Sequence, residues 1–98
     1  MSVPAPYLPE AEDDIDAAYA YYEQRLAGLG DRFLQALRDR VDCIQDNPEL
    51  YSIFYQDVRA APLRRFPYVV YYRVEDQRVL IIAVQHGRRS SQAWQDRA

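Results

Sequence analysis

The pattern that most limits how this chain can fold is a series of short β-forming segments in its second half. Val58–Arg65, Tyr68–Val74 and Val79–Gln85 are built from β-branched, aromatic and alternating apolar residues. Phe66-Pro67 and the EDQR sequence at residues 75–78 supply turns between them. Turns this short join neighbouring strands antiparallel, so the segment predicts a three-stranded meander.

Two residue patterns place these strands within the sheet. Pro62 cannot donate a hydrogen bond to a neighbouring strand, which predicts that the first strand lies at an edge. The third strand is apolar on both sides, which is typical of an interior strand. One face of the sheet must pack against helices. We expect the opposite face to present arginines.

The first half of the chain predicts two amphipathic helices joined by the sequence AGLGD at residues 27–31. The first begins at Pro9, and the acids that follow suit the positive end of a helix dipole. The second is expected from about Arg32 to Gln45, after Gly28 or Gly30 as the helix stop and Asp31 as the N-cap. The apolar stripes are Ile15, Tyr19, Tyr22 and Leu26 in the first helix, and Phe33, Leu37, Val41 and Ile44 in the second.

These elements predict a single α+β domain spanning residues 1–98, in which a helical hairpin packs on a small antiparallel sheet. The expected order is β-α-α-β-β-β, with a short C-terminal tail or helix. The first strand is expected within residues 2–8, where Val3, Ala5 and Tyr7 alternate with prolines that confine it to an edge. In the tail SSQAWQDR, we expect Trp94 to fold back as an apolar plug.

The composition excludes several classes of protein. One cysteine and one histidine cannot form a disulfide framework or a structural metal site, and Cys43 is expected in or near the core. We find no apolar run of about 20 residues, no signal-peptide pattern and no glycine-rich phosphate loop. We therefore expect a cytoplasmic protein with no membrane association, no metal and no small-molecule cofactor.

Charge is divided unevenly along the chain. Residues 1–50 hold four arginines and eleven acids, whereas Arg59–Arg89 holds seven arginines and two acids. Such asymmetry indicates a surface that receives an anionic partner. Lysine is absent and the sequence pI is about 5.0, which is unusual for a protein that binds nucleic acid over a large area.

The order and spacing of several segments resemble the RelE/ParE superfamily of toxins from type II toxin–antitoxin systems. The matching segments are LPEAEDDI, AYAYYEQR followed by GLGDRFLQAL, NP, VR, RRFPYVVYYRV and VLIIAVQHGRR. The resemblance implies a growth-inhibiting, plasmid-stabilising toxin. It also implies a cognate antitoxin, expected to be encoded in the adjacent gene, whose C-terminal segment wraps the toxin.

The resemblance leaves the target open. ParE-like members inhibit DNA gyrase without hydrolysis, whereas RelE-like members are endoribonucleases that cleave mRNA in the ribosome. A third alternative is an antitoxin-binding scaffold without toxicity. We favour gyrase because lysines are missing, the chain is acidic overall and no convincing acid–base pair is present.

The site residues differ between these alternatives. If the protein is a ribonuclease, His86 would act as acid or base, Arg59 or Arg65 would clamp the phosphate and Tyr71 could stack on a base. His86 could instead cap the end of its strand through a backbone hydrogen bond. Without catalysis, Tyr21, Tyr71 and the arginines would bind target or antitoxin. These arginines are Arg59, Arg64, Arg65, Arg73, Arg88 and Arg89, of which we expect two or three to pair with the chain's own acids.

Overall fold

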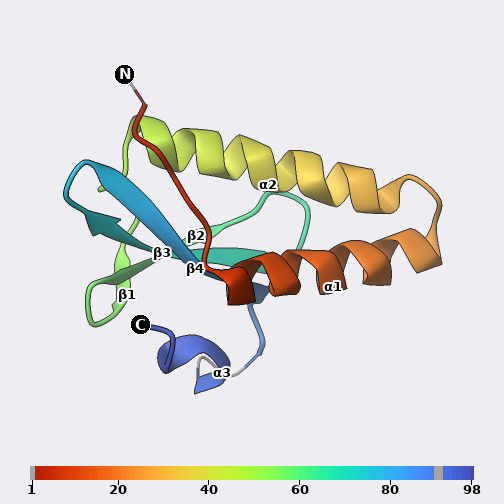
Figure 1. Ribbon diagram of the computed structural model, residues 1–98. Coiled ribbons are helices and arrows are strands. Elements are labelled where there is room, and N and C mark those ends of the chain that lie inside the picture. Colours follow the sequence, from red (N-terminus) through yellow and green to blue (C-terminus); the bar gives the residue numbers. More distant parts are fainter. Residues whose placement is uncertain (1, 90–91) are drawn as a thin grey trace.

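The computed structural model describes residues 2–89 and 92–98, and it shows a helical hairpin lying against a four-stranded antiparallel sheet (Figure 1). The elements are α1 (Pro9–Arg25), α2 (Leu29–Asp46), β1 (Ile53–Tyr55), β2 (Val58–Pro62), β3 (Tyr68–Glu75), β4 (Arg78–His86) and α3 (Gln92–Gln95). The sheet order is β1-β2-β3-β4. The α+β class, the hairpin and the meander of β2, β3 and β4 are therefore confirmed. The order differs from the prediction at its start, because residues 2–8 form no regular strand and an additional strand, β1, follows α2. The prediction that the strand containing Pro62 lies at an edge of the sheet is wrong, because β1 pairs with β2 on its outer side.

Residues 3–8 nevertheless complete the sheet by lying parallel to the outer edge of β4. The amide of Val79 donates to the Pro4 carbonyl at 2.8 Å. The amide of Ile81 donates to the Pro6 carbonyl at 2.9 Å. The prolines contribute only acceptors, so their missing N–H groups leave these bonds intact. This segment explains why the last strand of the sheet has the apolar composition of an interior strand.

The start of α2 depends on a residue of the preceding helix. The Glu23 carboxylate accepts hydrogen bonds from the amides of Gly28 and Gly30, at 3.0–3.1 Å. These are among the amides that a helix start leaves without a backbone partner. Gly28 precedes α2 with φ of 90°, a conformation that favours glycine. The predictions that Asp31 caps this helix and that it begins near residue 32 are therefore wrong.

The main core lies between the helices and one face of the sheet. The predicted stripe of α2 is buried throughout, whereas α1 is fully buried only at Ala11 and Ala18. Leu26, predicted in the α1 stripe, is 57% exposed. Tyr22 packs edge-on against Phe66, with ring centroids 4.9 Å apart, and stacks on Phe33 at 5.6 Å.

The opposite face of the sheet is covered by α3. Trp94 is completely buried and stacks on Tyr71, with ring centroids 4.3 Å apart. Val58, Ile82 and Ala83 complete this second cluster. The prediction that Trp94 folds back as a plug is confirmed. The prediction that this face presents arginines is wrong, because apolar residues and α3 cover it. The first two residues of the predicted tail, 90 and 91, lie outside the described residues.

In residues 2–89 and 92–98, no helix combines the length and apolar character needed to cross a membrane.

Candidate functional site

Four arginines gather at one end of the sheet. Arg64 and Arg65 lie in the β2–β3 turn, and Arg88 and Arg89 follow β4 directly. The antiparallel register brings these segments together, and the Gly87 amide donates to the Pro67 carbonyl at 2.8 Å. All four side chains are exposed, and none forms an ion pair within the described part of the chain. We call these four residues the terminal arginine cluster.

Arg59 lies elsewhere and supports a loop. It is paired with Tyr72 in the sheet, on the face that the helices cover. Its Nη1 donates to the carbonyl of Tyr51 at 2.7 Å and to the carbonyl of Glu49 at 3.2 Å. Its guanidinium is therefore engaged in fixing the chain between α2 and β1.

Arg73 lies on the other face of the sheet, paired with Val58. Its guanidinium approaches Glu75 at 3.6 Å and Asp57 at 4.0 Å, and it donates to the Ala98 carbonyl at 3.2 Å. Six arginines were expected from the sequence to bind a target or antitoxin. Four of them form the terminal arginine cluster, whereas Arg59 and Arg73 lie on opposite faces of the sheet. Among these six, Arg73 alone forms an ion pair with an acid of the described residues, fewer than the two or three expected.

His86 has a structural contact at the end of β4. Its Nδ1 accepts a hydrogen bond from the Arg88 amide at 3.1 Å, and its ring packs edge-on against Tyr68 at 5.6 Å. This is the strand-end cap considered as the alternative to catalysis. Arg59 is paired with Tyr72, four residues further along β3 than Tyr68, which corresponds to about 13 Å. The structure thus brings Arg65, but not Arg59, to the histidine's end of the sheet.

The two tyrosines considered as binding residues have different environments. Tyr71 is 5% exposed beneath Trp94, so its ring is not open to a nucleic-acid base. Tyr21 is 49% exposed on α1, and the guanidinium of Arg25 lies 4.2 Å from its ring centroid. Tyr21 therefore remains accessible to a partner, whereas Tyr71 belongs to the second core.

A groove adjoins the terminal arginine cluster and was not predicted from the sequence. It has a volume of about 920 Å³ and lies between α2 and the β2–β3 turn. Its lining residues are Tyr22, Leu29, Arg32, Gln35, Ala36, Asp39, Arg40, Cys43, Arg64, Arg65, Phe66 and Pro67. We call it the α2 groove. It contains four arginines and one acid, and Cys43 is exposed in it, contrary to the expectation of a core or near-core position.

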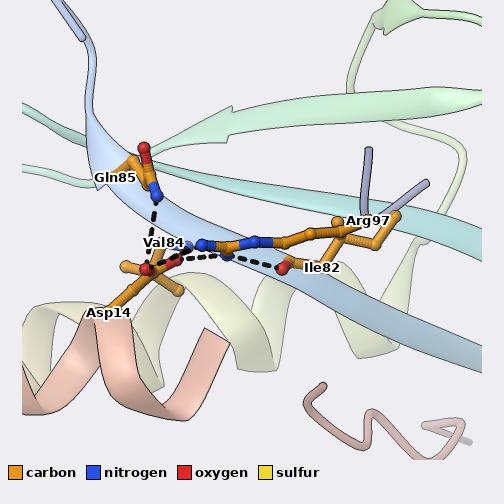
Figure 2. A network of polar contacts seen from close by, with 5 residues as sticks. All are labelled: Asp14, Ile82, Val84, Gln85 and Arg97. Atoms are coloured by element: carbon orange, nitrogen blue, oxygen red, sulfur yellow. Dashed lines mark hydrogen bonds and ion pairs between the residues drawn. The ribbon is translucent and has the colours of Figure 1, made fainter. Parts of the chain in front are cut away.

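A separate polar network anchors the C-terminus (Figure 2). Asp14 of α1 accepts hydrogen bonds from the Val84 amide at 3.1 Å and from Gln85 Nε2 at 3.2 Å. The Arg97 guanidinium donates to both carboxylate oxygens, at 2.7 and 3.3 Å. The hydrogen bond to Asp14 raises the pKa of Arg97 above its ordinary value. This network spans α1, β4 and the C-terminal segment and has the character of a structural clamp.

The architecture is therefore that of a small α+β fold with an exposed cluster of arginines at one end of its sheet. Residues 7–91 match the family model described as ParE toxin of type II toxin-antitoxin system, parDE. The chain belongs to this family of toxins.

A sequence relative agrees with that assignment, and a solved structure shares the fold. Toxin ParE2 from Mycobacterium tuberculosis, in strains CDC 1551 / Oshkosh and ATCC 25618 / H37Rv, is 32% identical over 83 residues. The match covers 84% of this chain and 79% of each relative. A structure of the chromosomal ParDE toxin–antitoxin system from P. aeruginosa superimposes with a TM-score of 0.77 at 19% identity. It covers 87% of this chain and 96% of the other, and at that identity it supports the fold.

Proposed function

We propose that this chain is a growth-inhibiting toxin that acts by binding DNA gyrase, and that a cognate antitoxin holds it inactive. The terminal arginine cluster is the observation that supports this proposal most directly. Its four exposed guanidinium groups form no ion pairs with described residues, and they project from two adjoining segments. Unpaired arginines of this kind suit an acidic patch on a protein partner.

The positions of the candidate catalytic residues also favour binding over RNA cleavage. Cleavage requires an acid, a base and a phosphate clamp around one phosphate group. Arg59 donates to two loop carbonyls about 13 Å along the sheet from the position of His86. Tyr71 is covered by Trp94. The net charge of −3 and the absence of lysine also disfavour docking on a long phosphate backbone.

One observation keeps a ribonuclease as the second candidate. Arg65 lies at the same end of the sheet as His86, because the β2–β3 turn adjoins the end of β4. In that alternative, His86 would transfer a proton and Arg65 would hold the phosphate.

The two candidates make opposite predictions when the toxin is induced without its antitoxin. We expect growth arrest, loss of supercoiling by purified gyrase and intact transcripts. Arg88→Glu/Arg89→Glu should abolish arrest and gyrase inhibition, because two charges of the terminal arginine cluster are reversed. Cleaved transcripts with normal supercoiling would identify the ribonuclease instead. Harmless induction of the folded protein would leave only an antitoxin-binding scaffold.

A further inference from the structure

Exposed large apolar side chains of the described residues gather at two places. Tyr21 and Leu26 lie at the C-terminal end of α1, and the others lie in or just before β1. Figure 1 shows that the closed end of the helical hairpin extends past the end of the sheet. Tyr22, beside Tyr21, packs on Phe66 of the β2–β3 turn, so this end of α1 adjoins the terminal arginine cluster.

Tyr21 is held in one orientation by its neighbours on α1. Its ring packs edge-on against Tyr22, with centroids 5.2 Å apart, and the Arg25 guanidinium lies 4.2 Å from its centroid. Arg25 forms no ion pair with the described residues, because the Glu23 carboxylate beside it accepts hydrogen bonds from amides at the start of α2. A ring and a guanidinium that are already in place lose little conformational entropy on binding, and both residue types are typical anchors of protein interfaces. We call Tyr21, Arg25 and Leu26 the α1 patch.

A row of ring contacts connects the α1 patch to the terminal arginine cluster. The ring centroids of Tyr22 and Tyr68 are 5.9 Å apart, and those of Tyr68 and His86 are 5.6 Å apart. The terminal arginine cluster continues from the end of β4 at His86. Burial raises the pKa of the Tyr68 hydroxyl, Tyr21 adds to this effect and Arg89 opposes it, so both lie near that hydroxyl. The two groups of side chains therefore form one continuous surface.

Charge and ring packing indicate what this surface would bind. With Arg25 added, it presents five guanidinium groups that form no ion pair with described residues, which suits the carboxylates of a partner. A single-stranded nucleic acid would need a series of open ring faces for its bases. Tyr22 and Tyr68 pack against each other, and Arg25 lies over one face of Tyr21. An acidic protein segment with an apolar side chain is therefore the better match.

We propose that the α1 patch and the terminal arginine cluster together form the surface that contacts the target, and that this surface receives an acidic segment of the target protein. An apolar side chain of that segment would contact Tyr21 and Leu26, and its carboxylates would pair with Arg25 and the cluster. The identity of the target rests on the proposed function, whereas the chemistry of the segment rests on the surface.

The test measures the concentration of the full chain that halves supercoiling by purified gyrase. Tyr21→Ala should raise this concentration by about tenfold or more, because it removes a pre-ordered aromatic anchor. Tyr21→Phe keeps the ring and should stay within about twofold of the unmodified chain. Circular dichroism and the melting temperature establish that each variant is folded.

Two exposed leucines provide a matched pair. Leu26 is 57% exposed in the α1 patch, and Leu50 is 62% exposed in the loop before β1. Leu26→Ala should weaken inhibition by about fivefold, because the target would cover its exposed surface, whereas Leu50→Ala should change it by less than about twofold. Neither side chain belongs to the core, so this pair decides the question even if Tyr21→Ala does not fold.

Charge reversal separates the α1 patch from the overall charge of the chain. Arg25→Glu should weaken inhibition by about tenfold or more, because it places a carboxylate against the acidic segment. Arg38→Glu makes the same change at an exposed position of α2 near Tyr7, and should change inhibition by less than about twofold. Equal effects of the two reversals would show that overall charge governs binding, and would overturn the role of Arg25.

The possible outcomes keep the two proposals apart. If the unmodified chain inhibits gyrase and all three α1 patch variants inhibit it equally well, the α1 patch proposal fails and the proposed function stands. If the unmodified chain does not inhibit gyrase, both fail together. If Tyr21→Ala keeps full inhibition but loses antitoxin binding, or loses self-association in sedimentation, the occupant is the antitoxin or a second copy of the chain, and the proposal is overturned.

Discussion

Asp14 in the second turn of α1 holds Arg97, the penultimate residue of the chain, with 2.7 Å between carboxylate and guanidinium (Figure 2). The two side chains are only 12% and 15% exposed. Arg97 also donates to the Ile82 carbonyl at 3.2 Å, so the pair joins the C-terminal segment to β4 as well as to α1. This clamp holds the segment that contains Trp94 over the second face of the sheet.

Breaking this clamp should loosen the C-terminal segment. Arg97→Ala leaves the Asp14 carboxylate partly buried without its charged partner, and we expect a loss of about 3 kcal/mol in the free energy of unfolding. Trp94 is the single tryptophan and is fully buried, so its fluorescence reports on this segment alone. We expect a red shift and stronger acrylamide quenching, measured together with urea denaturation.

An exposed ion pair provides the matched control. Arg78 lies 2.6 Å from Glu75, but its side chain is 49% exposed. Arg78→Ala should change stability by less than about 1 kcal/mol and leave the Trp94 spectrum unchanged. Equal losses in the two variants, or an unchanged Trp94 spectrum in Arg97→Ala, would show that the Asp14 contact does not anchor the C-terminus.

Tyr72 should make stability depend on alkaline pH. Burial raises the pKa of its hydroxyl from 10.0 to about 12, although nearby Arg59 acts in the opposite direction. Because the unfolded chain loses this proton first, the stabilising contribution is complete below pH 10. As pH rises from 10 to 12 the unfolded chain ionises before the folded chain, so the free energy of unfolding falls over this range by about 2–3 kcal/mol.

Tyr72→Phe tests this directly by denaturation between pH 7 and pH 12. At pH 7 the variant should be less stable by about 1 kcal/mol, because the hydroxyl donates to the Pro48 carbonyl at 2.5 Å. Above pH 10 the difference should shrink and then reverse, since phenylalanine has no proton to lose. A constant difference across the whole range would refute the assignment.

The sequence predicted correctly those elements whose own residues repeat with the period of a helix or a strand. The α2 stripe at Phe33, Leu37, Val41 and Ile44 repeats at helical spacing, and burial follows that spacing. β1 could not be predicted in this way, because its three residues pair only at one end of β2 and two of them are exposed. The capping of α2 by Glu23 was also missed. The Glu23 carboxylate accepts a hydrogen bond from the Gly30 amide seven residues later, which is outside the usual spacing of a helix cap.

The prediction that the arginines share one surface failed, because the pairing of neighbouring strands decides which face each arginine occupies. Arg59 and Arg73 lie on opposite faces of the sheet because the pairing places them beside Tyr72 and Val58 respectively. Charge counts along the chain do not contain this information. The α2 groove was missed because its Arg32 and Arg40 belong to the half of the chain that is acidic overall. Tertiary packing brings them beside the basic turn.

Substitution by alanine should lower stability at Arg59 and lower inhibition of the target at Arg64. Arg59→Ala removes a charged donor from the carbonyls of Glu49 and Tyr51, and should lower stability by about 1–2 kcal/mol. Toxicity should persist at temperatures where the variant is folded. Arg64→Ala should leave the melting temperature unchanged but weaken target inhibition, because its side chain is exposed in the terminal arginine cluster. A folded Arg59→Ala protein that has lost toxicity would revive the catalytic role of Arg59.

Arg65 has a backbone conformation that arginine adopts at a cost. Its φ is 70°, in the left-handed region, where a side chain other than glycine is disfavoured by roughly 1–2 kcal/mol. Arg65→Gly relieves this strain but makes the unfolded chain more flexible, and we expect a net gain of about 0.5 kcal/mol in stability. Gln77→Gly is the matched control, since Gln77 has φ of 61° in the β3–β4 turn, away from the terminal arginine cluster. Both variants should melt at or above the wild-type temperature, but only Arg65→Gly should lose gyrase inhibition. If Arg65→Gly keeps full activity, arginine at this strained position has no role in binding.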